Sequence, residues 1–387
     1  MNTYDVVIVG AGIHGAGAAQ AAAARGYSVL VLEQEHPAFG ASSRSSKLIH
    51  GGLRYLETWQ WRLVREALAE RALLLKLARD LVQLVPFHVP VYRHTRRGPW
   101  TVRAGLSLYA LLGGVGKAAR FSTVPRAQWS ALDGLKLSDL RAVFRYYDAQ
   151  TDDAALTRAV LRSARELGAE MLSPAKFTGA VREGGVLNVQ YVVGTDTREC
   201  RAHALVNAAG AWVNRVAAAI QPQPPLCDIE LVQGTHIVVP QRLAAGMFYL
   251  EAPQDARAVF VMPWRGGALV GTTETPFGGD PAAVRPLPDE IAYLQNVAMH
   301  YFPHGDWRAL SSFAGLRVLP AGKGAAFGRS RETHIRLTPS SPVVASIYGG
   351  KLTTYRATGA RLMAQLAPRL PARRARGDTA KLRLAPD

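Results

Sequence analysis

Residues 42–57, which read SSRSSKLIHGGLRYLE, combine the side chains and glycines that commonly hold an anion. The stretch contains several hydroxyl groups, a glycine pair, one histidine and three cations, namely Arg44, Lys47 and Arg54. A basic loop can simply be solvated. Glycines that let a ligand approach the backbone, flanked by fixed hydrogen-bond donors, favour binding instead. We therefore predict that this stretch lines a binding site.

The segment before it has the order of elements that binds a dinucleotide. Residues 5–9 read as a buried parallel strand, and an alanine-rich helix is expected over 16–24. Between them stand the three glycines of a GxGxxG pattern, Gly10, Gly12 and Gly15. They allow a tight turn, the approach of a pyrophosphate to the helix N-terminus, and close helix packing. A second strand, over 28–32, ends at Glu33, an acid placed to bind ribose hydroxyls.

Two later segments have a related character. Residues 204–210, ALVNAAG, read as a buried strand with a small-residue end, which suits either a wall against a dinucleotide or ordinary core packing. Residues 348–356, YGGKLTTYR, put a glycine pair and Lys351 before a helix expected to run to Ala367. That arrangement binds anions at a helix N-terminus, although a lysine there can also be solvated.

The middle of the chain changes from parallel-strand to antiparallel-strand patterns. Short β runs over 232–240, 258–264 and 268–273 predict an inserted antiparallel sheet that forms a substrate domain. His236 lies in the first run, where a lone histidine is more often structural than catalytic. A helix is expected over 60–84 from its apolar spacing.

Residues 93–112 are first basic and then aromatic and aliphatic, with Trp100 and Tyr109 near helical spacing. This pattern fits a helix packed on its domain or a helix lying in a membrane interface. The longest weakly polar run, 104–116, is too short to cross a bilayer. The chain enters its first strand by Tyr4, so we expect no signal peptide.

The charge of this 387-residue chain is unusually positive, at +17. Such a charge calls for an anionic partner, an anionic surface or a basic proteome as its explanation. The densest basic run, over 369–383, reads as part of a disordered tail, and the other arginines are spread along the sequence, which speaks against nucleic-acid binding. The two cysteines, Cys200 and Cys227, have no metal-ligand or CxxC spacing, so we predict neither a metal site nor a disulfide framework.

With these motifs in place, the chain resembles the FAD-dependent glycerol-3-phosphate dehydrogenases of the respiratory chain. Two strings carry the resemblance most specifically, SSKLIHGGLRYLE at 45–57 and GGKLTTYR at 349–356. Shorter matches lie at 10–15, 206–212, 234–240, 271–273 and 315–317. In three respects the chain departs from the family. Glu274 stands where the family commonly has Asp, and the C-terminal helical domain of the family is expected to be lacking. The residues after Arg317 are shortened and lack the usual acidic loop of the family.

The resemblance implies an α/β fold, with a Rossmann-type FAD-binding domain and an inserted antiparallel β-sheet substrate domain, like that of D-amino-acid oxidase. The FAD-binding domain would be discontinuous, over 1–80, 145–220 and 311–368. The substrate domain would cover 81–144 and 221–310, with the candidate membrane-interface segment 93–112, and 369–387 would form the disordered tail.

The implied reaction is oxidation of sn-glycerol 3-phosphate to dihydroxyacetone phosphate by hydride transfer to FAD, with the electrons passed on to a quinone. The implied setting is the cytoplasmic face of the membrane, with peripheral contact to anionic lipid and a homodimer as the assembly. The alternative within the same fold is an FAD-dependent amine or amino-acid oxidase, which would bind a carboxylate with one arginine. Three separate cations, Arg54, Arg317 and Lys351, speak against it. A flavin-binding protein without turnover is a further alternative.

The resemblance and the chemistry together suggest the site residues. Forked guanidinium donors and a point charge hold a phosphate dianion well, and a histidine suits the role of base. His236 is the first choice for that base and His50 the second. The substrate would lie among His50, Arg54, Tyr55, His236, Thr272, Thr273, Arg317 and Lys351. FAD would lie against Gly10, Gly12, Ile13, His14, Gly15, Glu33, Gln34, Ser42, Ser43, Ser45, Ser46, Lys47, Leu48, His50, Gly51, Gly52, Ala209, Gly210, Trp212, Gly350, Lys351, Leu352 and Thr353.

Overall fold

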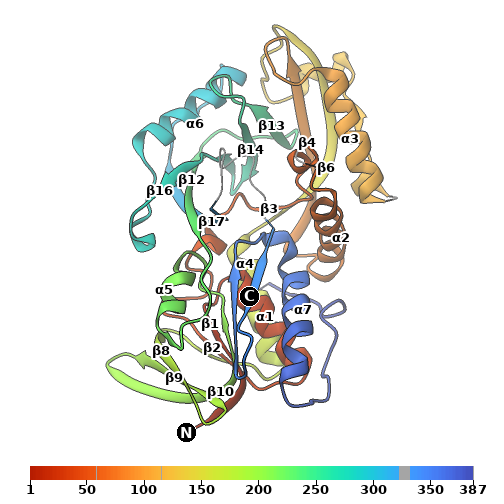
Figure 1. Cartoon of the computed structure of the whole chain (residues 1–387). Coiled ribbons are helices and arrows are strands. Elements are labelled where there is room, and N and C mark those ends of the chain that lie inside the picture. Colours follow the sequence, from red (N-terminus) through yellow and green to blue (C-terminus); the bar gives the residue numbers. More distant parts are fainter. Residues whose placement is uncertain (58, 115, 322–331, 387) are drawn as a thin grey trace.

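The computed structural model describes residues 1–57, 59–114, 116–321 and 332–386, and it is built around two β-sheets (Figure 1). A nine-stranded sheet lies in the lower half of the view and a ten-stranded sheet in the upper half. The chain crosses between the two halves several times. The α/β fold with an inserted antiparallel sheet, predicted from the sequence, is confirmed.

The nine-stranded sheet has a parallel centre in the order β19-β10-β1-β2-β7. The middle of β1 is fully buried because both faces of the sheet are covered, which explains its continuous apolar run. Antiparallel strands extend the sheet at its edges. The strands are β1 (Thr3–Val9), β2 (Val29–Leu32), β7 (Glu170–Leu172), β8 (Lys176–Glu183), β9 (Val186–Val193), β10 (Asp196–Asn207), β11 (Ile220–Gln221), β18 (His334–Leu337) and β19 (Val343–Tyr348).

Three helices pack together beside this sheet: α1 (Ile13–Ala24), α4 (Asp153–Glu166) and α7 (Tyr355–Leu366). Helices α1 and α7 lie side by side (Figure 1) and approach closely because α1 is made of small residues. A Cβ atom on Gly17 would lie 2.8 Å from the Tyr355 ring. Asp152 caps α4 by accepting a hydrogen bond from the Ala155 amide.

The ten-stranded sheet has the order β16-β12-β15-β14-β13-β4-β6-β3, with β17 added to β12 and β5 added to β6. Helix α6 (Pro288–Tyr301) packs on β12, β14 and β15, whereas α2 (Trp61–Leu77) contacts β4 and α3 (Pro99–Gly113) contacts β6. The strands are β3 (Leu48–Ile49), β4 (Val82–Tyr92), β5 (Ser122–Thr123), β6 (Leu140–Thr151), β12 (Ile229–Val239), β13 (Met247–Glu251), β14 (Ala258–Trp264), β15 (Gly267–Gly271), β16 (Thr275–Phe277) and β17 (Ser311–Pro320).

Short helices connect these elements and carry parts of the site. Helix α5 (Val213–Ala218) follows β10 directly after a 3₁₀ turn. The 3₁₀ helices are η1 (Ala41–Ser43), η2 (Leu53–Leu56), η3 (Lys117–Ala119), η4 (Arg126–Ala131), η5 (Gly210–Trp212), η6 (Pro281–Ala283), η8 (Leu352–Thr354) and η9 (Ala367–Arg369).

The boundaries differ from the expected ones in four places. Strands β3 and β17 and the end of β6 belong to the substrate sheet, although they fall in segments expected in the FAD-binding domain. Strand β17 pairs with β12 over its whole length, so the chain stays in the substrate sheet until Pro320. The helix expected over 60–84 ends at Leu77, because the later apolar residues belong to β4 and the turn before it.

The C-terminal segment was expected to be disordered. It is instead folded against the FAD-binding domain. The Arg373 guanidinium pairs with the Asp5 carboxylate at 2.8 Å, and the amides of Arg376 and Gly377 donate to the Ala24 carbonyl. Leu384 is buried in the core between the helices. These contacts could not be predicted from the basic composition of the segment, because the groups that accept hydrogen bonds from its arginines and amides lie far away in the sequence.

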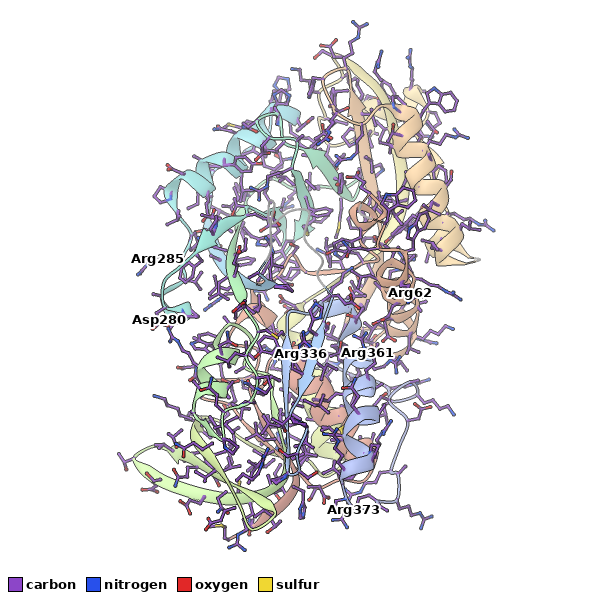
Figure 2. The ribbon with its side chains drawn as sticks, viewed as in Figure 1. Arg62, Asp280, Arg285, Arg336, Arg361 and Arg373 are labelled. Atoms are coloured by element: carbon purple, nitrogen blue, oxygen red, sulfur yellow. The ribbon has the colours of Figure 1, made fainter. Side chains whose placement is uncertain are left out.

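Positive charge is distributed over the molecule. The labelled arginines in Figure 2, Arg62, Arg285, Arg336, Arg361 and Arg373, come from different elements of both halves. Within the described part of the chain, no helix combines the length and apolar character needed to cross a membrane.

Candidate active site

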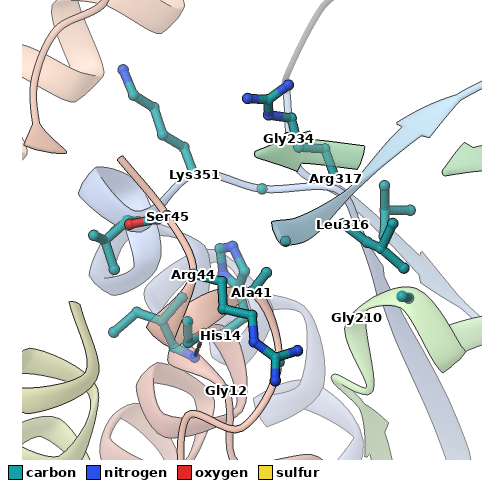
Figure 3. Close-up of a pocket in the computed structure, with 18 of the residues that line it drawn as sticks. Gly12, His14, Ala41, Arg44, Ser45, Gly210, Gly234, Leu316, Arg317 and Lys351 are labelled. Carbon is teal, nitrogen blue, oxygen red and sulfur yellow. Dashed lines mark hydrogen bonds between the residues drawn. The ribbon is translucent and has the colours of Figure 1, made fainter. Parts of the chain in front are cut away.

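A cavity of about 380 Å³ lies where the two sheets meet, and residues of both sheets line it. Figure 3 shows its walls. One end is formed by the turn before α1, the end of β2, the stretch around η1 and the end of β10. The other end is formed by β12, β14, β17 and the loop before η8.

Two glycines contribute space to the cavity, one in the turn before α1 and one in the loop before η8. Gly10 has φ +103°, and a Cβ atom there would lie 2.8 Å from the Ala208 carbonyl oxygen. Gly350 has φ +110°, and a Cβ atom there would lie 1.9 Å from Nε2 of His14. Both backbone conformations are strained for any other residue. The two glycines therefore form a cradle that can accommodate an anionic ligand group such as a pyrophosphate.

Glu33 is held beside this cradle by backbone donors. Its carboxylate accepts hydrogen bonds from the amides of Ala11 at 2.7 Å and Glu35 at 3.0 Å. Each carboxylate oxygen has two lone pairs, so the fixed acid can also accept from ribose hydroxyls. Ser42 lines the same end, and its Oγ accepts from the Ile13 amide at 2.9 Å in the first turn of α1.

Lys47 does not line the cavity, in contrast to the expectation that it contacts FAD. Its Nζ atom pairs with the Asp153 carboxylate at 2.6 Å and donates to the Ser43 carbonyl at 2.6 Å. The Ser45 amide donates to the same carboxylate at 2.9 Å. Burial raises the pKa of Asp153, and Lys47 opposes that effect. The lysine thus anchors the stretch to α4 and orients its serines toward the cavity.

His236 lies at the second end and is almost fully buried. Its Nε2 atom is 2.9 Å from Ser46 Oγ, and its ring stacks on Phe313 with centroids 5.0 Å apart. Burial, and next the charges of Arg317 and Lys47, hold the pKa of His236 well below its usual value. The imidazole is therefore neutral at physiological pH, the state in which a histidine can accept a proton. Its Nδ1 atom has no hydrogen-bond partner among the described residues.

Arg317 is held rigidly at the same end. Its guanidinium donates to Glu274 Oε1 at 3.1 Å, to Thr272 Oγ1 at 3.0 Å and to the Thr273 carbonyl at 3.2 Å. The Glu274 carboxylate also lies 3.7 Å from Arg257, which lines the cavity too. This carboxylate is therefore shared between two arginines.

Lys351 approaches from the loop before η8. Its Nζ atom donates to the His50 carbonyl at 2.6 Å and lies 5.2 Å from the centre of the Tyr55 ring. Figure 3 shows the side chains of Lys351 and Arg317 extending to the same side of the pocket, away from Gly12 and His14. Arg317 and Lys351 thus lie together at one end of the cavity, an arrangement that can hold an anionic substrate next to a dinucleotide.

Most of the predicted residues meet at this cavity. Those that line it are Gly10, Gly12, Ile13, His14, Glu33, Gln34, Ser42, Ser45, Ser46, Leu48, His50, Gly52, Tyr55, Ala209, Gly210, Trp212, His236, Thr272, Arg317, Gly350, Lys351 and Leu352. Those that do not are Gly15, Ser43, Lys47, Gly51, Thr273 and Thr353. The Arg54 side chain lies outside the described part of the structure.

The predicted residues that do not line the cavity pack against, or form hydrogen bonds with, other parts of the protein. A Cβ atom on Gly15 would lie 1.9 Å from the Gly10 carbonyl oxygen, so this glycine serves helix packing. Thr353 is fully buried, and its Oγ1 accepts from the His50 amide at 3.1 Å. Thr273 Oγ1 donates to the buried Glu290 at 2.8 Å.

Part of the cavity wall was not predicted from the sequence. Tyr249, Arg257 and Phe260 line the cavity from β13, β14 and the turn between them. These strands carry no glycine motif, so nothing local marks them as part of a site. Among the described residues, no group of histidines, cysteines and acids is arranged to hold a metal ion.

Buried histidines predict a particular loss of stability in acid. Burial, and next Arg145, lowers the pKa of His88 to about 4, and His236 is lowered as well. The unfolded chain binds protons at these groups below about pH 6.5, and the folded chain does not. Stability should therefore fall between pH 6.5 and about 4, by at most about 1.4 kcal/mol per pH unit for each histidine. Urea unfolding at several pH values measures this slope, and His88→Gln should reduce it. An unchanged slope in the variant would exclude His88 as a contributor.

The donors and spaces of the first end fit FAD. Gly10, Gly12 and Ser42 would hold its pyrophosphate at the N-terminus of α1, and Glu33 would hold its ribose. The buried Nδ1 atom of His14 lies in the same wall and has no hydrogen-bond partner among the described residues, so it can form a hydrogen bond with a ligand.

Residues 5–366 match the family described as FAD dependent oxidoreductase. The chain therefore belongs to the FAD-dependent oxidoreductases of this family, and FAD is its cofactor.

Individual relatives are similar over nearly the whole chain. A protein named glycerol-3-phosphate dehydrogenase from Pseudomonas aeruginosa is 39% identical over 94% of this chain and 72% of its own length. A protein named D-erythritol 1-phosphate dehydrogenase from Brucella abortus is 37% identical over 94% and 74%. The solved structure of glycerol-3-phosphate dehydrogenase from Bacillus halodurans with FAD is 26% identical, with a TM-score of 0.77 over 99% of this chain and 68% of that one.

Proposed function

We propose that this chain oxidises sn-glycerol 3-phosphate to dihydroxyacetone phosphate, with FAD as the immediate acceptor. The observation that carries the proposal is the pair of cations, Arg317 and Lys351, extending to one end of the FAD cavity beside the neutral His236. The name of the relative from Pseudomonas aeruginosa supports the same substrate.

Each residue at the substrate end has a separate task. Arg317 supplies planar guanidinium donors to the phosphate and Lys351 a point charge. His236 accepts the proton of the hydroxyl group that becomes the ketone, and its low pKa keeps it unprotonated for that step. The Thr272 hydroxyl accepts a hydrogen bond from the Arg317 guanidinium at 3.0 Å and so helps to orient that side chain. Bound FAD supplies the acceptor for the hydride.

Product analysis tests this proposal. The FAD-loaded protein, given glycerol 3-phosphate and a redox dye, should form one dihydroxyacetone phosphate for each two electrons transferred. Erythritol 1-phosphate, tested in parallel, measures how far the site accepts a longer polyol phosphate. A protein with full FAD content that turns over neither phosphate would contradict the proposal and leave a flavin-binding protein without this activity.

We also infer that reduced FAD passes its electrons to a quinone and that the chain contacts the inner face of the cytoplasmic membrane from the cytoplasmic side. Helix α3 supports this, because it buries Val102 and Leu106 but leaves the Trp100 and Leu111 side chains 82% and 77% exposed. Large apolar side chains beside the exposed Arg103 suit a surface of anionic lipid. A homodimer is part of the same proposal, and sedimentation of the holoprotein measures it.

Removing both apolar side chains should weaken this contact. The double variant Trp100→Ser, Leu111→Ser should bind vesicles of anionic phospholipid at least about tenfold more weakly, since burying one such side chain is worth about 1.5–3 kcal/mol. Leu310→Ser is the control, because Leu310 is 61% exposed but lies before β17. Equal vesicle binding of wild type and double variant in co-sedimentation would exclude α3 as the contact.

A further inference from the structure

The peptide group between His50 and Gly51 is hydrogen-bonded at both of its ends. Its carbonyl oxygen accepts the Lys351 ammonium at 2.6 Å, and its N–H donates to the Tyr109 hydroxyl at 2.8 Å. Lys351 lines the cavity, whereas Tyr109 lies behind its wall on α3. One planar group therefore connects a cation of the site with a buried side chain outside it.

The Tyr109 hydroxyl is fixed in turn by a buried ion pair. It donates to Asp148 Oδ2 at 2.8 Å, and the other oxygen of this carboxylate pairs with Arg71. The three side chains are at most 3% exposed, and none of them lines the cavity. Arg71 also donates to the carbonyls of Tyr147 and Ala118, both at 2.9 Å. The guanidinium is thus held on several sides.

The direction of these bonds decides what the network does. A phenol has one proton, and Tyr109 gives it to Asp148, so its oxygen is left to accept from the Gly51 amide. That bond sets the rotation of the peptide, which aims the His50 carbonyl at Lys351. Donation from the N–H also strengthens the carbonyl as an acceptor, because linked hydrogen bonds polarise one another.

Both glycines of this segment are tightly packed against neighbouring side chains. A Cβ atom on Gly51 would lie 2.6 Å from the Tyr109 oxygen and 2.7 Å from Leu68. Gly52 has φ +84°, and a Cβ atom there would lie 2.3 Å from the Tyr55 ring. Without these glycines the peptide could not approach both Tyr109 and Lys351.

We propose that Tyr109, fixed by Asp148 and Arg71, is a positioning residue that sets the place of the Lys351 ammonium through the His50–Gly51 peptide. It acts on binding of the anionic group of the substrate and touches neither substrate nor FAD. This inference rests on the proposed function, in which Lys351 holds the phosphate.

Tyr109→Phe tests it by removing one hydroxyl group. The KM for glycerol 3-phosphate should rise about tenfold, the loss expected for one hydrogen bond to an oriented buried group, with kcat within about threefold of wild type and FAD content unchanged. Tyr92→Phe is the matched control: Tyr92 is 2% exposed and donates to the Lys136 carbonyl at 2.6 Å, away from the cavity. Both variants should lose similar stability. If both leave KM unchanged, Tyr109 is structural only and the proposal fails.

A double-mutant cycle with Lys351→Ala separates action through the lysine from a general effect. The readout is binding of inorganic phosphate, followed by perturbation of the flavin absorbance, which needs no turnover. In the Lys351→Ala background, Tyr109→Phe should change this affinity by less than about twofold, since the group it positions is gone. A full tenfold effect there would overturn the proposal.

If Tyr109→Phe does not accumulate as holoprotein, Arg71→Lys provides a second test of the proposal. It keeps the charge beside Asp148 but gives up bonds to the carbonyls, and KM should rise about threefold. An unchanged KM in this folded variant would count against the proposal. Failure of wild type to oxidise glycerol 3-phosphate would instead refute the proposed function, and the phosphate cycle would still report on Tyr109.

Discussion

Replacing Arg317 by alanine should lower kcat/KM for glycerol 3-phosphate by about 10³-fold, because truncating one partner of a buried, hydrogen-bonded charge pair costs about 2–5 kcal/mol. The substrate phosphate loses a fixed guanidinium. The Glu274 carboxylate, 7% exposed, is left with Arg257 at 3.7 Å. Its negative charge then faces the phosphate, which adds repulsion to the lost attraction. Steady-state kinetics with a dye acceptor measures the effect.

Two further variants make this result specific. Arg308→Ala removes an arginine that is 74% exposed and, within the described residues, pairs with the nearby Asp306, so kcat/KM should stay within about twofold. Arg317→Lys keeps the positive charge but loses the planar, two-pronged set of guanidinium N–H donors. It should therefore recover only part of the activity. A kcat/KM for Arg317→Ala within about fivefold of wild type would remove Arg317 from the substrate site.

Gly350→Ala should abolish stable FAD binding, with a rise in Kd of at least about 100-fold. The new Cβ atom would lie 1.9 Å from His14 Nε2, and the backbone there has φ +110°. Because His14 lies in the first turn of α1, the clash would push the C-terminal loop away from the GxGxxG turn and open the cradle between them. Titration of the apoprotein with FAD, read by quenching of flavin fluorescence, gives the two dissociation constants.

Gly98→Ala is the control for this glycine. Gly98 precedes α3 with φ −73°, and a Cβ atom there would have no neighbour within 4 Å. Its Kd for FAD should equal that of wild type. A Gly350→Ala protein that is purified with full FAD content would show that the two loops do not form the cofactor cradle as described.

Local sequence patterns were sufficient for the elements that hold FAD. The run β1, the GxGxxG turn and α1 are adjacent in the chain, so periodicity and glycine positions mark them directly. The membership of β3 and β17 in the substrate sheet could not be predicted from local patterns, because strand pairing depends on which distant strand is available.

The same distinction applies to the site. His236, Arg317 and Lys351 stand in recognisable strings, and the structure brings them to one cavity. The bond between Lys47 and Asp153 was not predicted, because Asp153 lies 106 positions later and no pattern links the two. The Tyr109 network was missed for the same reason.

The most direct test of the whole account is anaerobic reduction of the bound flavin by candidate substrates. Glycerol 3-phosphate should bleach the flavin absorbance of the purified holoprotein completely. Glycine, sarcosine and D-amino acids should leave it unchanged, because the substrate end of the cavity is built from several cations rather than one arginine in an apolar pocket. Bleaching by an amine but not by glycerol 3-phosphate would contradict the account and make the chain an amine or amino-acid oxidase of the same fold.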